Sequence, residues 1–132
     1  MILIKGAHIF SPEDLGVKDI MIINDRVVMI GDDLSPISDA MVIIDGKDKI
    51  LMPGLIDGHV HITGGGGEGS FKTRVPEITL SKLISGGITT TLGLLGTDSI
   101  TRSVENLVAK AKALKEEGIT CLTVTGSYGY PS

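Results

Sequence analysis

The alternation of apolar and polar residues predicts only β-strands in the first 50 positions. Apolar residues dominate a stretch at 2–10, ILIKGAHIF, and a longer one at 19–31, DIMIINDRVVMIG. The polar pair Asn24-Asp25 divides the longer stretch, which indicates a hairpin between two strands. A further short strand is predicted at 41–46, MVIIDG. No segment here has the length and periodicity of a helix, so residues 1–50 are expected to form part of a small all-β domain.

After residue 50 the pattern alternates between strand and helix. Apolar runs of strand length are separated by segments in which apolar residues recur at helical spacing. Such an order is typical of βαβ units with a parallel sheet, and strands that are apolar almost throughout are expected where both faces are covered. The predicted strands lie at 55–61, 88–96 and 119–126, and the predicted helices at 75–87 and 103–118.

The two predicted helices have recognisable ends. Pro76 suits the first turn of the first helix, and Gly86-Gly87 suits its C-terminal end. Ser103 is a good N-cap for the second helix, and Gly118 ends it. Residues 51–132 are therefore predicted to form the first strands and helices of an α/β domain.

Composition and charge narrow the classes of function. The formal net charge is −4, which argues against a nucleic-acid partner or an anionic membrane surface, since both need clustered Lys and Arg. No apolar run approaches the roughly 20 residues of a membrane span. The single cysteine, Cys121, excludes an internal disulfide and any multi-cysteine zinc site. A lone thiol predicted in an apolar strand fits a core position in a cytoplasmic protein.

The last predicted strand has no covering helix after it within the 132 residues. An uncovered strand of this kind leaves apolar surface exposed. We therefore expect the chain to be the N-terminal piece of a longer protein.

A pair of histidines lies at the end of the strand predicted at 55–61. Alternate residues of a strand point to the same face, so His59 and His61 are expected to point the same way and to converge on one metal ion. Asp57 has the same parity, which leaves two roles open for it: metal ligand, or acceptor that orients a histidine. Two ligands do not complete a catalytic site. The third histidine, His8, lies in the β region and is interpreted as structural.

Four glycines follow the histidine pair almost at once, in the sequence TGGGGEG. One register, Gly64-x-Gly66-x-x-Gly69, matches a dinucleotide-binding pattern, but that pattern requires a helix immediately after it, and none is predicted there. The glycines alternatively allow backbone N–H groups to approach a ligand closely, or form an exposed flexible loop. Glu68 would place a carboxylate beside the histidines, to bind metal or a cationic group of a substrate.

The stretch MPGLIDGHVH resembles the metal-binding opening of the amidohydrolase superfamily. HVHITGGGGEG, GLLGTDS and TGSYGYPS are similar to a narrower group within it, the isoaspartyl (β-aspartyl) dipeptidases, of which this chain would cover about the first third. The resemblance implies a (β/α)8 TIM-type barrel preceded by part of a small β-sandwich, with the division near residue 50. It further implies two zinc ions, with His59 and His61 on the first, and a metal-bridging hydroxide that attacks the peptide carbonyl.

The same resemblance implies roles for residues of three loops. Glu68 would bind the free α-ammonium of the isoaspartyl residue, and Thr97 with the backbone of Gly66 would hold its α-carboxylate. Tyr128 would polarise the scissile carbonyl and stabilise the developing oxyanion. Asp98 and Ser99 are interpreted as loop or capping residues. A homo-oligomer is implied for the full-length enzyme.

Other ligands of the family's metal site have no counterpart in this chain: a carboxylated lysine, two further histidines and an aspartate that acts as general base. We therefore expect no dipeptidase activity from these 132 residues alone. Three other interpretations stay open: another amidohydrolase, such as a dihydroorotase-like cyclic amidase or an N-acetyl-amino-acid deacetylase; a non-catalytic βαβ module that binds a nucleotide; and a fragment that completes a barrel with a second polypeptide.

Overall fold

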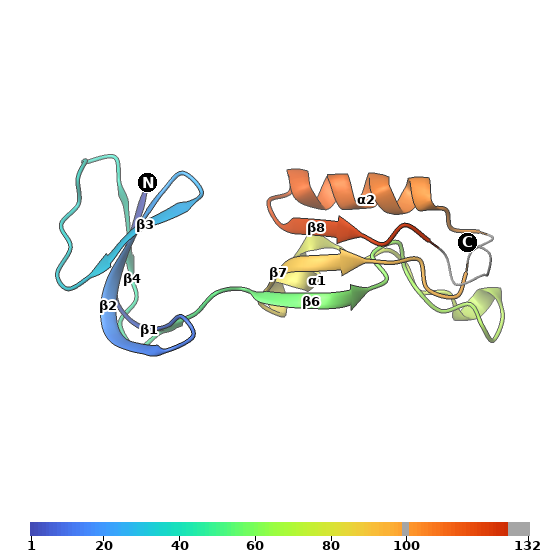
Figure 1. Cartoon of the computed structure of the whole chain (residues 1–132), viewed down its shortest axis with the longest axis horizontal. Helices are drawn as coiled ribbons and strands as arrows, with labels where there is room; N and C mark the ends of the chain where they lie inside the picture. Colours follow the sequence, from blue (N-terminus) through green and yellow to red (C-terminus); the bar gives the residue numbers. More distant parts are fainter. Residues whose placement is uncertain (99–100, 127–132) are drawn as a thin grey trace. The chain divides into compact units, whose positions relative to one another are not determined.

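The computed structural model describes residues 1–98 and 101–126, and its contacts divide the chain into two compact units, Met1–Pro53 and Gly54–Ser132 (Figure 1). Each unit is described by itself. No helix among the described residues is long and apolar enough to cross a membrane.

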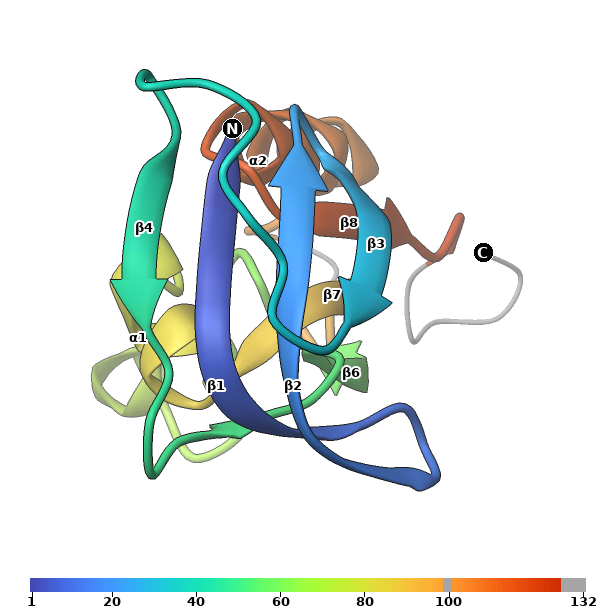
Figure 2. The same ribbon diagram turned by 90° about the vertical axis from the view of Figure 1, so that its left-hand side faces the viewer.

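The first unit consists of strands, as the pattern of apolar residues predicts. Its sheet has the order β3-β2-β1-β4, and β5 also pairs with β1 (Figure 2). β1 runs antiparallel to β2 and parallel to β4 and β5. The strands are β1 (Ile2–Phe10), β2 (Asp14–Ile23), β3 (Arg26–Gly31), β4 (Val42–Asp45) and β5 (Ile50–Leu51).

The hairpin between β2 and β3 turns at Asn24-Asp25, as predicted, and Asn24 has a φ of 55°. Asparagine tolerates this left-handed conformation better than most residues, because its short polar side chain can hydrogen-bond locally. The side chain of His8 makes two contacts within this unit. Its Nε2 lies 2.6 Å from Asp14 Oδ1, and its ring stacks on Phe10 with the centroids 4.8 Å apart. These contacts agree with the structural interpretation of His8.

The second unit is a parallel three-stranded sheet with two helices. Its elements in chain order are β6 (Leu55–Val60), the 3-10 turn η1 (Phe71–Thr73), α1 (Leu80–Ser85), β7 (Ile88–Gly93), α2 (Val104–Glu116) and β8 (Thr120–Thr123). The strand order is β6-β7-β8, and both neighbouring pairs are parallel, which confirms the predicted βαβ construction.

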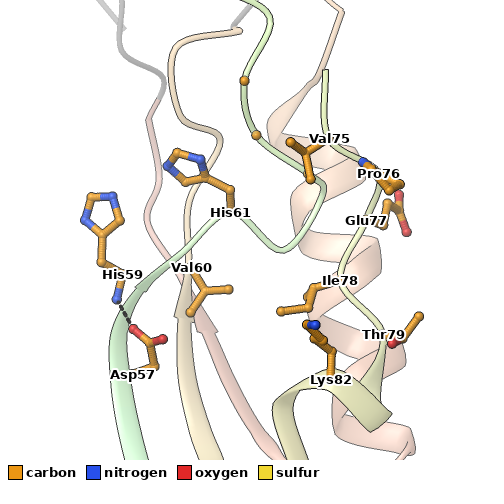
Figure 3. Close-up of a pocket in the computed structure, with 13 residues that line it drawn as sticks. Asp57, His59, Val60, His61, Val75, Pro76, Glu77, Ile78, Thr79 and Lys82 are labelled. Atoms are coloured by element: carbon orange, nitrogen blue, oxygen red, sulfur yellow. Dashed lines mark hydrogen bonds between the residues drawn. The ribbon is translucent and has the colours of Figure 1, made fainter. Parts of the chain in front are cut away.

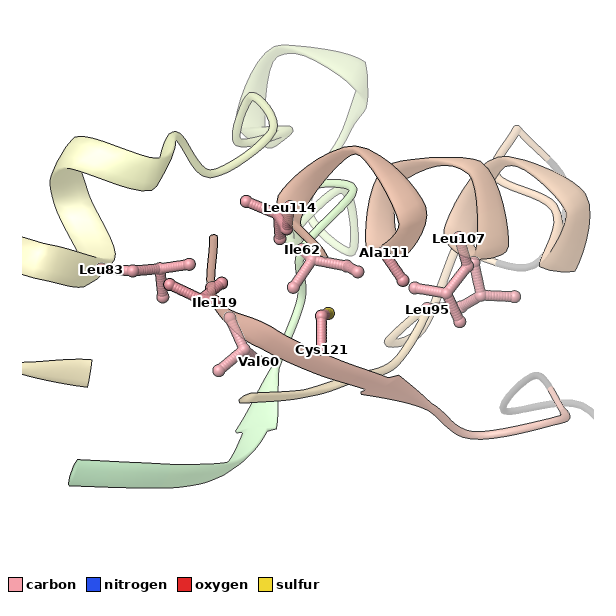
Figure 4. Packing of buried hydrophobic residues seen from close by; sticks show 9 residues of the cluster. All are labelled: Val60, Ile62, Leu83, Leu95, Leu107, Ala111, Leu114, Ile119 and Cys121. Atoms are coloured by element: carbon pink, nitrogen blue, oxygen red, sulfur yellow. The ribbon is translucent and has the colours of Figure 1, made fainter. Parts of the chain in front are cut away.

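One apolar cluster joins both helices to the sheet (Figure 4). Leu83 comes from α1, Leu107 and Leu114 come from α2, and Val60 and Cys121 come from the strands. Cys121 is buried, as predicted, and burial raises the pKa of its thiol. Side chains alternate between the faces of a strand, and Leu122, next to Cys121, is 56% exposed. One face of β8 is therefore not covered by the described residues.

The end signals predicted for α2 are confirmed. Ser103 is its N-cap and accepts a hydrogen bond from the Asn106 backbone N–H at 3.2 Å. Gly118 follows the helix with a φ of 111°, a conformation that glycine adopts without steric cost.

The prediction for the first helix is wrong at its start. We expected a helix over 75–87 with Pro76 in its first turn, but α1 begins at Leu80. The preceding residues are extended because their N–H groups bond elsewhere: Val75 N donates to Gly65 O at 2.8 Å, and Ile78 N donates to Ile62 O at 3.2 Å. The segment before α1 is thereby attached to the chain that follows β6.

Candidate functional site

The two predicted metal ligands lie side by side at the carboxyl end of β6 (Figure 3). The ring centroids of His59 and His61 are 5.4 Å apart, with 42° between the ring planes. The strand ends at Val60, one residue before the predicted end, so His61 belongs to the loop and its ring is not held by strand pairing.

Asp57 supports the backbone of the histidine pair. Its Oδ1 accepts a hydrogen bond from the His59 backbone N–H at 3.1 Å (Figure 3). The carboxylate therefore fixes the main chain of His59, and the hydrogen bond that the structure records for Asp57 does not involve an imidazole nitrogen.

The glycines after β6 approach other parts of the chain closely. We call residues 63–69 the glycine loop. A Cβ added at Gly64 would collide with the Val75 carbonyl oxygen, and one added at Gly66 would collide with that of Thr73. Gly64 and Gly66 also have φ of 89° and 71°. The prediction that these glycines make room for a ligand is therefore incomplete, since two of them make room for the segment at 73–76.

Two further glycines enclose the imidazole of His61. A Cβ at Gly65 would lie 2.6 Å from His61 Nδ1, and a Cβ at Gly96 would lie 2.7 Å from His61 Cε1. Both distances are shorter than real Cβ atoms show, so only glycine fits at either place without displacing the ring. Gly96 follows β7, which means that the loops after two neighbouring strands together define the position of one candidate ligand.

Glu68 and Thr97 meet, although 29 positions separate them in the sequence. The Thr97 hydroxyl donates to Glu68 Oε1 at 2.5 Å. This hydrogen bond is the main reason that the pKa of the Glu68 carboxyl lies below its usual range, with smaller contributions from its own backbone N–H and the charges of His61 and Arg102. Glu68 is thus an exposed, ionised carboxylate with a fixed neighbour.

The structure places the candidate residues in two adjoining sets rather than one. His59, His61 and the backbone of Gly66 line one pocket, together with residues 75–79 and Lys82. Glu68 and Thr97 line a second pocket, with Phe71, Arg74 and Asp98. Tyr128, which the resemblance makes the group that polarises the carbonyl, and Ser99 lie outside the described residues.

Asp98, predicted as a loop or capping residue, closes the turn after Thr97. Its carboxylate accepts from the Thr101 backbone N–H at 2.9 Å and from the Thr101 hydroxyl. It also forms ion pairs with Arg102 at 3.1 Å and with Arg74 at 3.5 Å. Asp98 therefore connects the candidate substrate residue before it to two arginines.

Arg102, which is 5% exposed, was not among the predicted site residues. One signal was available. Arg102 directly precedes the N-cap Ser103, and a positive charge at a helix N-terminus is unfavourable because the helix dipole is positive there. An arginine in that place is expected to have partners elsewhere.

A family model for the amidohydrolase family matches residues 50–131. The chain belongs to the amidohydrolase family. The family fold is a TIM-barrel fold with mixed α and β content, which agrees with the parallel sheet and helices of the second unit.

Known amidohydrolases resemble the chain along almost its whole length. It is 51% identical to β-aspartyl dipeptidase from Fervidobacterium islandicum AW-1, solved in complex with β-Asp-Leu; the match covers 98% of this chain and 34% of that one, with a TM-score of 0.89. It is 34% identical to dihydroorotase from Clostridium acetobutylicum, over 95% of this chain and 30% of that protein. A D-hydantoinase from Thermus sp. is 23% identical, with a TM-score of 0.61 over 88% of this chain and 24% of that one, and shows the shared fold. The chain spans between about a quarter and a third of the length of these relatives.

The histidine pair agrees with membership of a family that is generally metal-dependent. Two adjacent imidazoles are a chemically suitable pair of nitrogen donors for a metal such as zinc. Among residues 1–98 and 101–126 there is no group of three or more His, Cys, Asp or Glu side chains placed to hold one ion. The described part of the chain therefore contains two candidate metal ligands and not a complete set.

Proposed function

We propose that this chain is part of a metal-dependent dipeptidase that hydrolyses isoaspartyl (β-aspartyl) dipeptides. The similarity to the β-aspartyl dipeptidase of Fervidobacterium islandicum AW-1 supports the substrate class. The observation that carries the proposal is the 2.5 Å hydrogen bond between Thr97 and Glu68.

This contact fits the chemistry of an isoaspartyl group. In a β-linked dipeptide the free ammonium and the free α-carboxylate of the aspartyl residue are attached to the same carbon atom. Groups that recognise the two charges must therefore be neighbours. Glu68 offers a carboxylate for the ammonium, and once the ammonium pairs with Glu68 the adjoining Thr97 hydroxyl is expected to turn its single proton from Glu68 to the α-carboxylate. In an α-linked dipeptide the ammonium and the terminal carboxylate lie at opposite ends, and dihydroorotate has no ammonium.

The histidines supply the reactive end of the proposed site. His59 and His61 would hold one of two zinc ions. Zinc held by these histidines would supply a Lewis acid for the scissile carbonyl and a water molecule of lowered pKa as the nucleophile for hydrolysis. The chain itself orients the substrate: Glu68 and Thr97 bind the isoaspartyl end, the Gly66 backbone contributes a further donor, and Tyr128 is proposed to donate to the carbonyl oxygen as charge develops there.

The proposal includes the architecture and the setting of the protein. We propose that residues 51–132 form the first β/α units of a (β/α)8 barrel and that residues 1–50 form the first part of a β-sandwich. The buried Cys121 thiol supports a cytoplasmic location, and the intact protein is proposed to be a homo-oligomer.

Substrate selectivity tests the proposal. The intact natural protein that contains this chain is loaded with zinc and offered β-Asp-Leu, α-Asp-Leu and dihydroorotate. We expect hydrolysis of β-Asp-Leu alone. Glu68→Gln keeps the shape of the side chain and removes the charge, and it is expected to raise KM strongly. The matched control is Glu116→Gln, at the end of α2, which should leave KM unchanged. Turnover of dihydroorotate in preference to β-Asp-Leu would contradict the proposal.

A further inference from the structure

A buried guanidinium group connects the loops of the candidate site. The side chain of Arg102 is only 3% exposed. A buried charge is costly unless it is paired and hydrogen-bonded. Arg102 meets this requirement through four hydrogen bonds to four different residues.

The partners of Arg102 belong to three separate segments. Its Nε donates to the Thr63 carbonyl at 3.1 Å, and its Nη2 donates to the carbonyls of Gly65 and Val75, each at 3.2 Å. Its Nη1 donates to Asp98 Oδ2 at 3.1 Å. The glycine loop, the segment before α1 and the loop after β7 are thus held by one planar group.

Every segment that Arg102 holds carries part of the proposed site. Gly65 packs against the imidazole of His61 and precedes Gly66 by one residue. Asp98 directly follows Thr97, whose hydroxyl holds Glu68. Arg102 itself lines neither the pocket with the histidines nor the pocket with Glu68 and Thr97.

We infer that Arg102 is a positioning residue that sets the distance between the glycine loop and the loop after β7, and thereby the affinity of the Glu68–Thr97 pair for the charged end of the substrate. It acts through backbone carbonyls and Asp98 and does not contact the substrate. The geometry requires arginine, because three donor nitrogens in a fixed plane reach acceptors on three segments. A lysine has the same charge and only one nitrogen. The substrate named here rests on the proposed function.

Arg102→Lys tests this inference in the intact, zinc-loaded protein. Displacement of a positioned group by about 1 Å costs on the order of 100-fold in rate. We expect KM for β-Asp-Leu to rise by roughly 10- to 100-fold, because the loops that carry Glu68 and Thr97 are displaced. We expect kcat to fall as well, because Gly65, which Arg102 holds, packs against the His61 imidazole. The control is Leu107→Ala, which destabilises the same unit from within α2 without touching the network. Its KM should equal that of the wild type.

Hydrogen exchange gives a readout that does not depend on turnover. Amides of residues 64–68 and of Val75 should exchange faster in Arg102→Lys than in Leu107→Ala, when both are compared at equal distance below their melting temperatures. The inference is overturned if KM is unchanged in Arg102→Lys, if KM rises equally in Leu107→Ala, or if exchange in the glycine loop is the same in both variants. Failure of the wild-type protein to hydrolyse β-Asp-Leu would instead contradict the proposed function, and hydrogen exchange would still decide whether Arg102 holds the loops.

Discussion

Replacing Gly96 by alanine should displace His61, a proposed metal ligand, by a distance that the structure defines. The added Cβ would lie 2.7 Å from His61 Cε1. Ordinary contacts between carbon atoms are about 3.5–4.0 Å, so the imidazole has to move by about 1 Å. Metal–nitrogen distances tolerate deviations of only about 0.2 Å, so a shift of this size disrupts coordination. We expect the zinc affinity of the intact protein to fall by roughly 10- to 100-fold, the range seen when a group that orients a ligand is lost.

Gly87 provides a control that separates the displacement of His61 from the cost of backbone strain. Gly96 has a φ of 76° and Gly87 has a φ of 73°, so alanine costs about 1–2 kcal/mol at either position from the left-handed conformation alone. The Cβ of Gly87→Ala would meet only Leu55 Cδ1, at an ordinary 3.8 Å. Both variants should lose similar stability in urea denaturation without metal, but only Gly96→Ala should lose zinc affinity.

The assay is competition for zinc against a chromophoric chelator, with the wild type, Gly96→Ala and Gly87→Ala measured together. Gly65→Ala adds an independent check, because Gly65 does not have a positive φ and its Cβ would lie 2.6 Å from His61 Nδ1. It should lose zinc affinity without the backbone cost. Equal zinc affinity in Gly96→Ala and Gly87→Ala would refute the reasoning.

Three further predictions concern ionisation and packing. Thr97→Val removes the donor that chiefly lowers the pKa of Glu68. In the wild type the stability from this carboxylate is complete above the ordinary glutamate pKa and is lost as pH falls through the lowered one. In Thr97→Val this stabilisation should shrink and the carboxyl pKa should rise towards its ordinary value, which carbon-13 NMR titration of the carboxyl would detect. Leu114→Ala, in the fully buried core, should cost about 2–5 kcal/mol in urea denaturation, and a cost below 1 kcal/mol would contradict the packing described. The Cys121 thiol, whose pKa is raised by burial, should react with a disulfide reagent far more slowly in the folded protein than in urea; rapid labelling of the native state would oppose this.

Local signals predicted the parts of the fold that local interactions determine. The turn at Asn24-Asp25 and the N-cap Ser103 depend on conformational preference and on a hydrogen bond to a residue three positions away, so the sequence reveals both. The start of α1 depends on bonds from Val75 and Ile78 to residues 10 and 16 positions earlier. A proline at the first turn of a possible helix is a weaker influence than these bonds, and periodicity cannot detect them.

The candidate site also has features that local signals predict and features that depend on distant contacts. Strand parity led us to expect the rings of His59 and His61 together, and their centroids are 5.4 Å apart although His61 lies one residue beyond the end of β6. The enclosure of His61 by Gly96, and the bonds from Arg102 to Thr63 and Gly65, join positions 35 to 39 residues apart. The glycine run is easy to recognise in the sequence, but the residues that contact it can be identified only in the folded chain.

The glycine loop also determines which positions of this protein are open to redesign. Within residues 64–69, Glu68 is the only residue that is not glycine. Gly64, Gly65 and Gly66 each face atoms of the chain itself, so a larger residue at any of them acts first on the shape of the loop. Libraries intended to change substrate preference should therefore vary Glu68 together with Thr97 and keep the glycines. The fixed backbone of the loop then allows new specificity to be tested at these two side chains without rebuilding the loop.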